Sequence, residues 1–356
     1  MLRSLTRWLR GEDAGISVPP MDGALKPNNR LEESERLLTL PAIDNLAADG
    51  DAAYCSSGSV LYRLARRGAN WSAERIDEFP GIVTSIAAAK GRLAVGIDGR
   101  GILLSNGNRA WQPIDPGADL AACMVAAAFA PNGDLLVAVG SRHLPAAEWK
   151  RDLMQHGSSG CILAIDPQGN AEIRREGLAF PFGIGATADG RVLVSESWRH
   201  RILALGDGRP VLDDLPAYPA RIAPAADGGL WLSLFAPRRQ LFEMVLREHD
   251  YRREMLQTIS SADWIGPELH SHGSADQPLQ AGSIRQMGIV KPWAPSRSYG
   301  LVVKCDAACR PVASWHSRAD GTLHGVTSVV ESGGDVLAMA RGADTLLRLR
   351  DGQTRP

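Results

Sequence analysis

The chain has 356 residues, of which 44% are hydrophobic, enough to bury a large core as two domains or as one extended closed architecture. Its 39 Lys and Arg residues nearly balance its 40 Asp and Glu residues, so no long-range field draws the protein onto nucleic acid or an anionic membrane. A small neutral molecule is the more natural partner. Five cysteines scattered along the chain argue against a secreted disulfide framework, and we expect ordinary buried or surface thiols.

Residues 1–34 are expected to form an extended arm that leads into the folded domain. The start, "MLRSLTRWLRGEDAGISVPP", lacks the continuous apolar segment of a signal peptide. No run in the chain approaches the ~20 apolar residues of a membrane span. These features predict a soluble, cytoplasmic protein without a transmembrane segment.

A turn followed by an alternating strand occurs six times in the chain. The six instances are "DGDAAYCSS" at Asp49, "KGRLAVGI" at Lys90, "NGDLLVAV" at Asn132, "DGRVLVSE" at Asp189, "DGGLWLSL" at Asp227 and "GGDVLAMA" at Gly333. Asp-Gly, Asn-Gly and Gly-Gly pairs tolerate the positive φ of hairpin turns, and aliphatic residues follow them. Each unit is therefore predicted to be a tight hairpin that leads outward along a sheet.

The spacing of these units predicts the architecture. The first three turns lie about 40 residues apart, which is typical of a four-stranded propeller blade. The third unit is stretched by "RHLPAAEWKRDLMQHGSSG", and the fifth by residues 239–298, after which "YGLVVKC" supplies the next strand. Six units with two insertions favour one all-β, six-bladed β-propeller over residues 35–356 rather than two separate domains.

The insertion at residues 239–298 in the fifth blade is predicted to be helical. Its start has an amphipathic pattern, with Leu241, Phe242, Val245 and Leu246 on one helical face. Two interpretations carry equal weight. The insertion is either a lid that covers a pocket mouth and excludes water, or a helix that only seals a hydrophobic surface.

A Trp-Arg-His cluster, Trp198, Arg199 and His200, interrupts the fourth unit. It falls at the hairpin that joins two outer strands, far from the axis of a propeller. We therefore predict that the cluster packs within its blade. Ligands on this architecture are expected to meet the inner strands and the top loops, where all blades converge.

Four segments of the chain together resemble a known family. They are "GLAFPFGIGATADGRVLVSESWRHRILAL", "LPAYPARIAPAADGGLWLSLFAPRRQL", "SYGLVVKCD" and "HGVTSVVESGGDVLAMA", in that order. They are similar to the strictosidine synthase-like family, within the six-bladed propeller group that contains gluconolactonases, paraoxonases and related arylesterases. The resemblance runs from about residue 35 to the C-terminus. It implies the fold more specifically than the reaction, since one fold hosts several chemistries.

For the hydrolase branch of that group, the resemblance implies a calcium ion in the axial channel that acts as a Lewis acid. The matching ligand positions here are Asp44 for an acid of the first blade, Phe182 for an Asn, and Ala220 with Arg221 for an Asp-Asn pair. Phe offers no oxygen, and the fixed charge of an arginine repels a divalent cation. We therefore expect no metal cofactor. Calcium would bind only if this alignment of Phe182 and Arg221 were wrong.

Two interpretations of Arg221 remain open. Its guanidinium either pairs with Asp44 across the channel, where its charge replaces that of the metal, or points to solvent while Asp44 caps its own turn. Phe182, Thr327 and Thr84 are predicted to line the substrate pocket.

The plant synthases of the family use a Glu near the start of the last blade's inner strand to manage protons. The matching position is Thr327, which is no acid or base near neutral pH, so condensation of an amine with an aldehyde is disfavoured. His324 lies three residues earlier. It either faces the channel and titrates near neutrality, or is structural.

Hydrolysis of a lactone or an aryl ester is the leading hypothesis. In it, His324 activates water, Arg221 stabilises the oxyanion and Asp44 orients one of them. The alternatives are a propeller that binds a small molecule without catalysis, favoured by the missing ligand positions, and an amine-aldehyde condensing lyase of the strictosidine synthase type. The chain has no nucleophile elbow, P-loop or dinucleotide fingerprint, so serine-hydrolase, nucleotide and NAD chemistry have no support.

Overall fold

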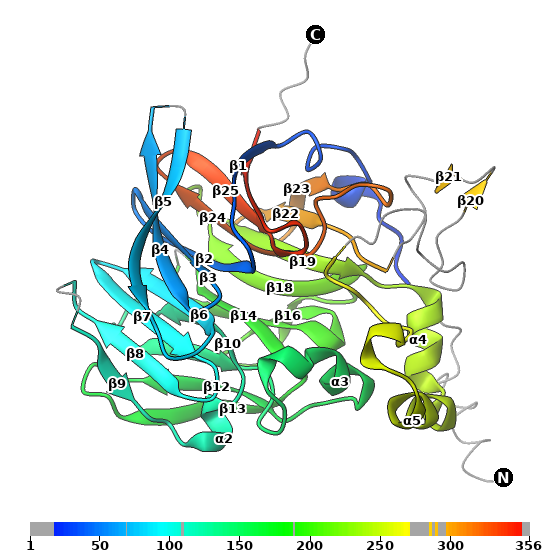
Figure 1. Ribbon diagram of the computed structural model, residues 1–356, viewed down its shortest axis with the longest axis horizontal. Coiled ribbons are helices and arrows are strands. Elements are labelled where there is room, and N and C mark those ends of the chain that lie inside the picture. Colours follow the sequence, from blue (N-terminus) through cyan, green and yellow to red (C-terminus); the bar gives the residue numbers. More distant parts are fainter. Residues whose placement is uncertain are drawn as a thin grey trace.

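The protein is a six-bladed β-propeller, as the six repeats predict (Figure 1). The computed structural model describes residues 18–350 except 69, 108–109, 188, 271–284, 287–288 and 291–296. Six four-stranded antiparallel sheets form the blades, and every turn quoted above joins the first two strands of one of them. Gly190 (φ 83°) and Gly228 (φ 82°) are two turn positions that require the left-handed backbone.

The strands fall into blades in chain order. The first blade has β2 (Ile43–Asp49), β3 (Ala52–Ser57), β4 (Val60–Arg67) and β5 (Asn70–Glu78), and the second has β6 (Val83–Ala89), β7 (Arg92–Ile97), β8 (Gly101–Ser105) and β9 (Gln112–Ile114). The third has β10 (Met124–Phe129), β11 (Leu135–Val139), β12 (Gly160–Ile165) and β13 (Ala171–Leu178), and the fourth has β14 (Pro181–Ala186), β15 (Val192–Glu196), β16 (Arg201–Ala204) and β17 (Pro210–Leu212). The fifth has β18 (Ala217–Pro224), β19 (Leu230–Pro237), β22 (Leu301–Cys305) and β23 (Pro311–His316), and the sixth has β24 (Val326–Ser332), β25 (Asp335–Ala340), β26 (Thr345–Leu349) and β1 (Glu35–Thr39).

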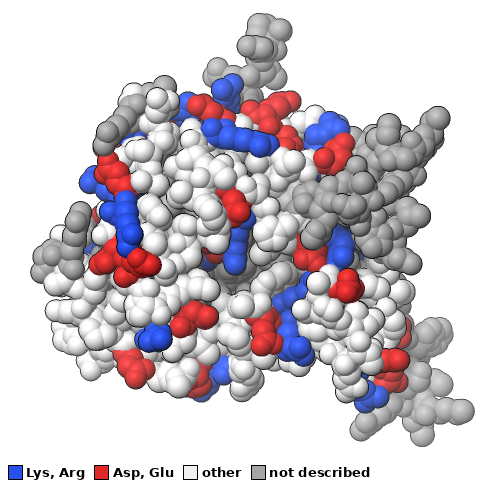
Figure 2. Space-filling model, viewed as in Figure 1, with Lys and Arg blue, Asp and Glu red and all other residues white. Residues whose placement is uncertain are grey.

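The inner strands contact one another in the ring order β2, β6, β10, β14, β18, β24 and back to β2, so they surround a central channel. Buried aliphatic residues fill the spaces between neighbouring blades, as in the cluster of Val137, Val139 and Leu163. Figure 2 shows acidic and basic side chains interspersed over one face of the molecule, in keeping with the balanced composition.

The N-terminal segment closes the ring. β1 pairs antiparallel with β26, with Glu35 opposite Arg348, and becomes the outermost strand of the last blade. Before it, η1 (Gly23–Leu25) lies against β23, where the Ser314 hydroxyl donates to the Ala24 carbonyl at 2.6 Å. The described part of the arm therefore binds the side of the propeller.

Two insertions lie together on one side of the ring (Figure 1). The third blade contributes η2 (Ala146–Glu148) and α3 (Trp149–Met154), and the fifth contributes α4 (Gln240–Arg247), α5 (His249–Thr258), η4 (Ser261–Asp263) and the β20 (Arg285–Gln286) and β21 (Ile289–Val290) ribbon. The remaining short helices are α2 (Ala118–Ala121), η3 (Ser197–Arg199) and η6 (Arg341–Ala343). No helix in the described part of the chain is long and apolar enough to cross a membrane.

A buried ion cluster ties the two insertions to each other. The Lys150 ammonium of α3 pairs with the Glu268 carboxylate of the fifth-blade insertion, and Arg297 Nη2 lies 2.7 Å from the same carboxylate. The predicted apolar face of α4 is confirmed, since Phe242, Val245 and Leu246 are buried.

Candidate functional site

All six inner strands share an irregularity at one level of the channel. In each of them the register with the second strand slips near the strand's start. One residue at each slip belongs to the set that we name the bulge ring: Asn45, Thr84, Val125, Phe182, Arg221 and Thr327. The slips in β2 and β18 also include Leu46 and Ala220. A bulged residue is released from the hydrogen-bond ladder and its side chain is re-aimed. Site residues predicted from separate strands are therefore brought together in one ring.

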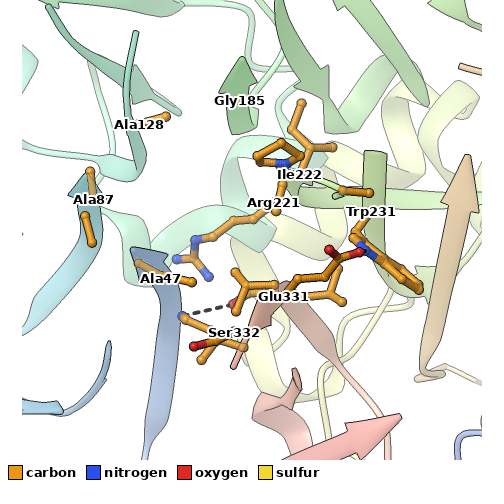
Figure 3. Close-up of a pocket in the computed structure, with 18 of the residues that line it drawn as sticks. Ala47, Ala87, Ala128, Gly185, Arg221, Ile222, Trp231, Glu331 and Ser332 are labelled. Atoms are coloured by element: carbon orange, nitrogen blue, oxygen red, sulfur yellow. Dashed lines mark hydrogen bonds between the residues drawn. The ribbon is translucent and has the colours of Figure 1, made fainter. Parts of the chain in front are cut away.

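Arg221 divides the channel into two cavities and lines both. The upper pocket, where the inner strands begin, has a volume of about 200 Å³, and the lower cavity, at the end with the tight turns, has about 980 Å³. Figure 3 shows the lower cavity with small residues such as Ala47, Ala87 and Gly185 on its walls. The Arg221 side chain reaches across the channel there toward the strand that carries Ala47.

The Arg221 guanidinium lies in a cage of four oxygens. Nη1 is 2.7 Å from Asp44 Oδ1, and Nη2 is 2.5 Å from Asn45 Oδ1. Nη2 and Nε also donate to the carbonyls of Thr84 (3.2 Å) and Val125 (3.1 Å), which bulging frees from the ladder. Of the two interpretations of Arg221, the structure shows the pair with Asp44.

Local backbone geometry aims the Asp44 and Asn45 side chains. Asn45 has a φ of 60°, a left-handed conformation that Asn adopts more readily than most residues. Its side-chain amide donates to Ser56 Oγ and to the Val83 carbonyl, both at 2.8 Å, which leaves Oδ1 for the guanidinium. Sequence reasoning passed over Asn45 because regular alternation would turn it away from the channel.

Asp44 is a buried carboxylate held ionised by its neighbours. Arg341 Nη1 lies 3.0 Å from Oδ2, and Oδ1 accepts from the Thr327 hydroxyl at 3.0 Å. Burial alone would raise the pKa of Asp44, but the charges of Arg221 and Arg341 outweigh it and lower the pKa to about 2.

Aromatic side chains form the walls of the upper pocket. They are Trp149 from α3, Phe180 and Phe182 at β14, Trp198 from η3 and Phe235 from β19. Phe180 stacks on Trp198 with ring centroids 4.5 Å apart, and Trp149 meets Phe235 edge to face at 5.6 Å. The Arg221 guanidinium lies 5.1 Å from the centroid of the Phe182 ring.

The position of Trp198 differs from the sequence prediction for the Trp-Arg-His cluster. Trp198 was expected to pack within its blade, but it lines the upper pocket, because η3 turns the chain at the channel end of β15 rather than at the outer rim. His200 is buried as well, but it packs against the fifth blade, with its Nε2 3.4 Å from Glu243 Oε1 of α4 and its ring 4.6 Å from that of Tyr218 in β18. Packing within the fourth blade therefore describes neither Trp198 nor His200.

The fifth-blade insertion reaches the pocket at one described point, Leu269. Val245, Leu246 and Met255 of its helices pack behind the aromatic wall, in the same core cluster as Phe180 and Phe235. Of the two interpretations, sealing of a hydrophobic surface describes α4 and α5. The stretch at Leu269 forms part of the pocket itself.

The two threonines of the predicted pocket occupy different places. Thr84 lines the upper pocket. Thr327 is fully buried and is not part of the described lining, because its hydroxyl is turned onto Asp44. It positions Asp44 rather than meeting a ligand.

His324 lies outside the upper pocket. Its Nδ1 is 2.7 Å from Ser298 Oγ, and its Nε2 is 2.7 Å from the Arg318 carbonyl oxygen. Burial lowers the pKa of His324 below the ordinary histidine value. With both ring nitrogens engaged, His324 has no free position for a water molecule, so the structural alternative describes it and it leaves the candidate site.

Asp98 and Arg341 are pocket residues that sequence reasoning missed. Asp98 directly follows β7 and Arg341 directly follows β25, the second strands of their blades. The sequence prediction placed ligand contacts on inner strands and top loops and did not single out these positions. The six repeats could have identified these positions. In each blade the second strand runs back toward the end of the channel where the inner strands begin, so the residue directly after it lies near the upper pocket. Gly58, after β3, lines the pocket for the same reason.

The residues at the calcium position implied by the resemblance do not fit a divalent cation. Calcium would need the Asp44 carboxylate, the Asn45 amide oxygen and nearby carbonyls, and these oxygens accept N–H groups of Arg221. A permanent charge at the centre of the cage repels a second cation. Among the described residues, no group of three or more His, Cys, Asp or Glu side chains is placed to hold a metal ion.

Comparisons with known proteins agree on the fold. The chain matches no family model and no curated protein. Its structure is similar to that of regucalcin, a calcium-binding protein from Agrobacterium tumefaciens, with a TM-score of 0.55 and 10% identity over 89% of this chain and 92% of that one. It is also similar to a gluconolactonase from Xanthomonas campestris, with a TM-score of 0.51 and 12% identity over 88% of this chain and 87% of that one.

A third similar structure is the PQQ-bound aldose sugar dehydrogenase from Streptomyces coelicolor, with a TM-score of 0.51 and 14% identity over 88% of this chain and 96% of that one. The structural neighbours of the chain thus include gluconolactonase- and regucalcin-type six-bladed propellers. Likeness at such low identity shows the fold alone, and the dehydrogenase shows that this fold does not name a reaction. The strictosidine synthase-like resemblance stays a prediction.

Proposed function

We propose that the upper pocket hydrolyses an aryl ester or an apolar lactone without a metal ion. The observation that carries the proposal is a pocket with an aromatic wall above two guanidinium groups, Arg221 and Arg341. The rings offer a surface to a flat apolar group. The guanidinium groups offer positive charge where the carbonyl oxygen of the ester becomes an oxyanion. The gluconolactonase among the structural neighbours shows that lactone hydrolysis is compatible with this fold, without assigning the reaction to this chain.

The size and lining of the pocket favour an apolar substrate with one ring. Its volume of about 200 Å³ lies below the range of about 300 to 1,000 Å³ that is typical of ligand pockets. A sugar lactone would bury several hydroxyl groups against aromatic carbon, and each unsatisfied group costs about 1 to 3 kcal/mol. Ile82 also lines the pocket with 59% of its surface exposed, which adds an apolar side chain for an entering ligand.

The two guanidinium groups have different roles in the proposed reaction. Arg341 is 40% exposed at its side chain, and the one ion pair of its guanidinium among the described residues is with the Asp44 carboxylate, so it has N–H groups left to donate to the substrate oxygen. Arg221 donates to four protein oxygens. It therefore acts through its charge and by holding Asp44 in place.

A second candidate function is binding of a small aromatic molecule without turnover. The mutual engagement of Arg221 and Asp44 favours it, because neither group has much capacity left for a ligand. The condensing lyase has less support, since Thr327 supplies no titratable group and its hydroxyl is committed to Asp44.

A substrate panel tests the proposal. Purified protein is assayed with phenyl acetate, dihydrocoumarin and gluconolactone, each with and without EDTA. We expect turnover of the first two, insensitivity to the chelator, and a loss of about 10²- to 10³-fold in kcat for Arg341→Gln, as for removal of one oxyanion donor. Failure to turn over any of the three, or loss of turnover in EDTA, contradicts the proposal. A rise in melting temperature with phenol but no product from any ester supports the binding alternative.

A further inference from the structure

We propose that Asp98 accepts the proton of the water that attacks the ester in the upper pocket, which makes it a catalytic residue. The inference rests on the proposed function and supplies the acid–base group that the reaction needs. The titratable side chains among the described residues that line the pocket are Asp44, Asp98, Arg221 and Arg341. Arginines stay protonated. One of the two aspartates is therefore the proton acceptor.

Asp44 is unsuited to accept a proton. Its two oxygens already accept from Arg221, Arg341 and Thr327. These interactions stabilise the ionised form so strongly that the pKa of Asp44 is about 2. A base with so low a pKa is a weak proton acceptor near neutral pH.

Asp98 has the opposite environment. Its Oδ1 is buried and makes no hydrogen bond to any residue that the structure describes. Asp98 also lines the upper pocket and is only half-buried as a residue, and its other oxygen, Oδ2, is not among the buried unpartnered atoms. Among the described residues no protein group donates to either oxygen, so the carboxylate is left to accept from a water molecule that meets Oδ2 in the pocket. Burial raises the pKa of Asp98 above the ordinary aspartate value, toward the range in which a carboxylate works as a general base.

The start of β6 holds Asp98 close to the guanidinium cage. The Asp98 N–H donates to the Ile82 carbonyl at 2.9 Å, and the Thr84 carbonyl, two residues further along the chain, accepts from Arg221 at 3.2 Å. Asp98, Arg221 and Arg341 line the same pocket. An ester carbonyl beside the guanidinium groups would therefore have Asp98 within the same pocket, where it can meet the attacking water.

The charged and titratable groups around Asp98 are Arg221, Arg341 and Asp44 across the pocket, Arg100 on its own turn and Cys123 of the third blade. Burial raises the pKa of the Cys123 thiol to about 12, so it stays neutral. The arginines keep their charge at all working pH values. Asp98 is then the pocket group whose protonation changes on the acid side of neutrality.

The proposed step balances as follows. The water oxygen bonds to the carbonyl carbon, the π electron pair moves to the carbonyl oxygen beside Arg341, and the water proton moves to Asp98. The carbonyl then re-forms as the bond to the leaving oxygen breaks, and Asp98 returns the proton to that oxygen. The products are an acid and an alcohol or phenol, or one hydroxy acid from a lactone, and Asp98 is again ionised.

The test is the pH dependence of phenyl acetate hydrolysis by the full-length protein and its Asp98→Asn variant. We expect wild-type kcat/KM to fall on the acid side with a midpoint above the ordinary aspartate range. Asp98→Asn should lose this acid limb and about 10²- to 10⁴-fold in kcat, with KM changed by no more than about threefold. Asp98→Glu should recover part of kcat and the acid limb. Asp134→Asn, in the tight turn at the opposite end of the third blade, is the matched control.

The outcomes separate the two proposals. Turnover by wild type with the same kcat and pH profile in Asp98→Asn overturns the role of Asp98 and leaves the hydrolase intact. Absence of turnover by wild type overturns both. If Asp98→Asn does not fold, as judged by its melting curve, Asp98→Ser replaces it with the same expected loss.

Discussion

The first prediction concerns Arg221, whose guanidinium divides the central channel and pairs with Asp44. Replacing Arg221 by Met keeps an unbranched side chain of similar length and removes the guanidinium. Asp44 then stays buried with one partly exposed cationic partner, Arg341. Removing one member of a buried ion pair costs about 3 to 5 kcal/mol, because the other charge is left without its compensation. We therefore expect the free energy of unfolding of Arg221→Met to be about 3 to 5 kcal/mol lower than that of wild type.

This loss is measurable by thermal unfolding. The entropy of unfolding is roughly 2.1 cal/mol/K per residue, which over 356 residues is about 0.75 kcal/mol/K. A loss of about 3 to 5 kcal/mol therefore lowers the melting temperature by about 4 to 7 °C. The Asp44→Asn, Arg221→Met double variant should lose less than the sum of the single variants, since the uncompensated carboxylate is gone.

Arg310→Met is the matched control, because Arg310 also forms an ion pair, with Asp306 at 2.8 Å, but its side chain is 78% exposed. Exposed pairs contribute about 0 to 1 kcal/mol, so its melting temperature should fall by about 1 °C at most. If Arg221→Met melts no lower than Arg310→Met, the guanidinium cage does not stabilise the fold as a buried ion pair should, and the reasoning fails.

Three further predictions follow from buried charges and thiols. Glu268→Gln keeps an acceptor oxygen but removes the negative charge that compensates the buried Lys150 and Arg297 cations, so trypsin should cut the fifth-blade insertion several-fold faster than in wild type. Asp44 and Glu243 both have pKa values lowered to about 2, from ordinary values of 3.8 and 4.5. Their stabilisation is therefore complete above about pH 5 and is lost progressively as pH falls toward 2, so the melting temperature should drop steeply in that window and less so in Asp44→Asn. All five cysteines are buried, and burial raises their pKa values, so a thiol reagent should titrate five groups after denaturation and almost none before.

The repeated turns made the fold predictable. An Asp-Gly or Gly-Gly pair followed by alternating aliphatic residues is a local signal, and each instance is a hairpin in the structure. The pairing of β1 with the last blade was not predictable in this way. Glu35 of β1 lies opposite a residue of β26 more than 300 positions away, and the sequence of neither strand indicates its partner.

The site was predictable only in part, and the physical reason is the bulge ring. Strand alternation assigns residues to faces only while the register is regular, and the register slips in every inner strand at the level of the site. Comparison with the ligand positions of the resembled family identified Arg221 and Phe182, because the strands that carry them are recognisable by sequence. It could not show that Asn45 turns into the cage or that His324 turns away.

A guanidinium and a metal ion place positive charge in a channel with different consequences. A calcium ion accepts six to eight oxygens and exchanges some of them for substrate, whereas Arg221 is covalently fixed and donates in one plane to four protein oxygens. A charge held in this way cannot be removed by a chelator, but it also has little freedom to engage a ligand. The groups left to meet a substrate are then Arg341 and Asp98, which both follow second strands and reach the upper pocket from outside the cage. The proposed hydrolysis should therefore respond to changes at these two positions, and stability should respond to changes in the cage below them.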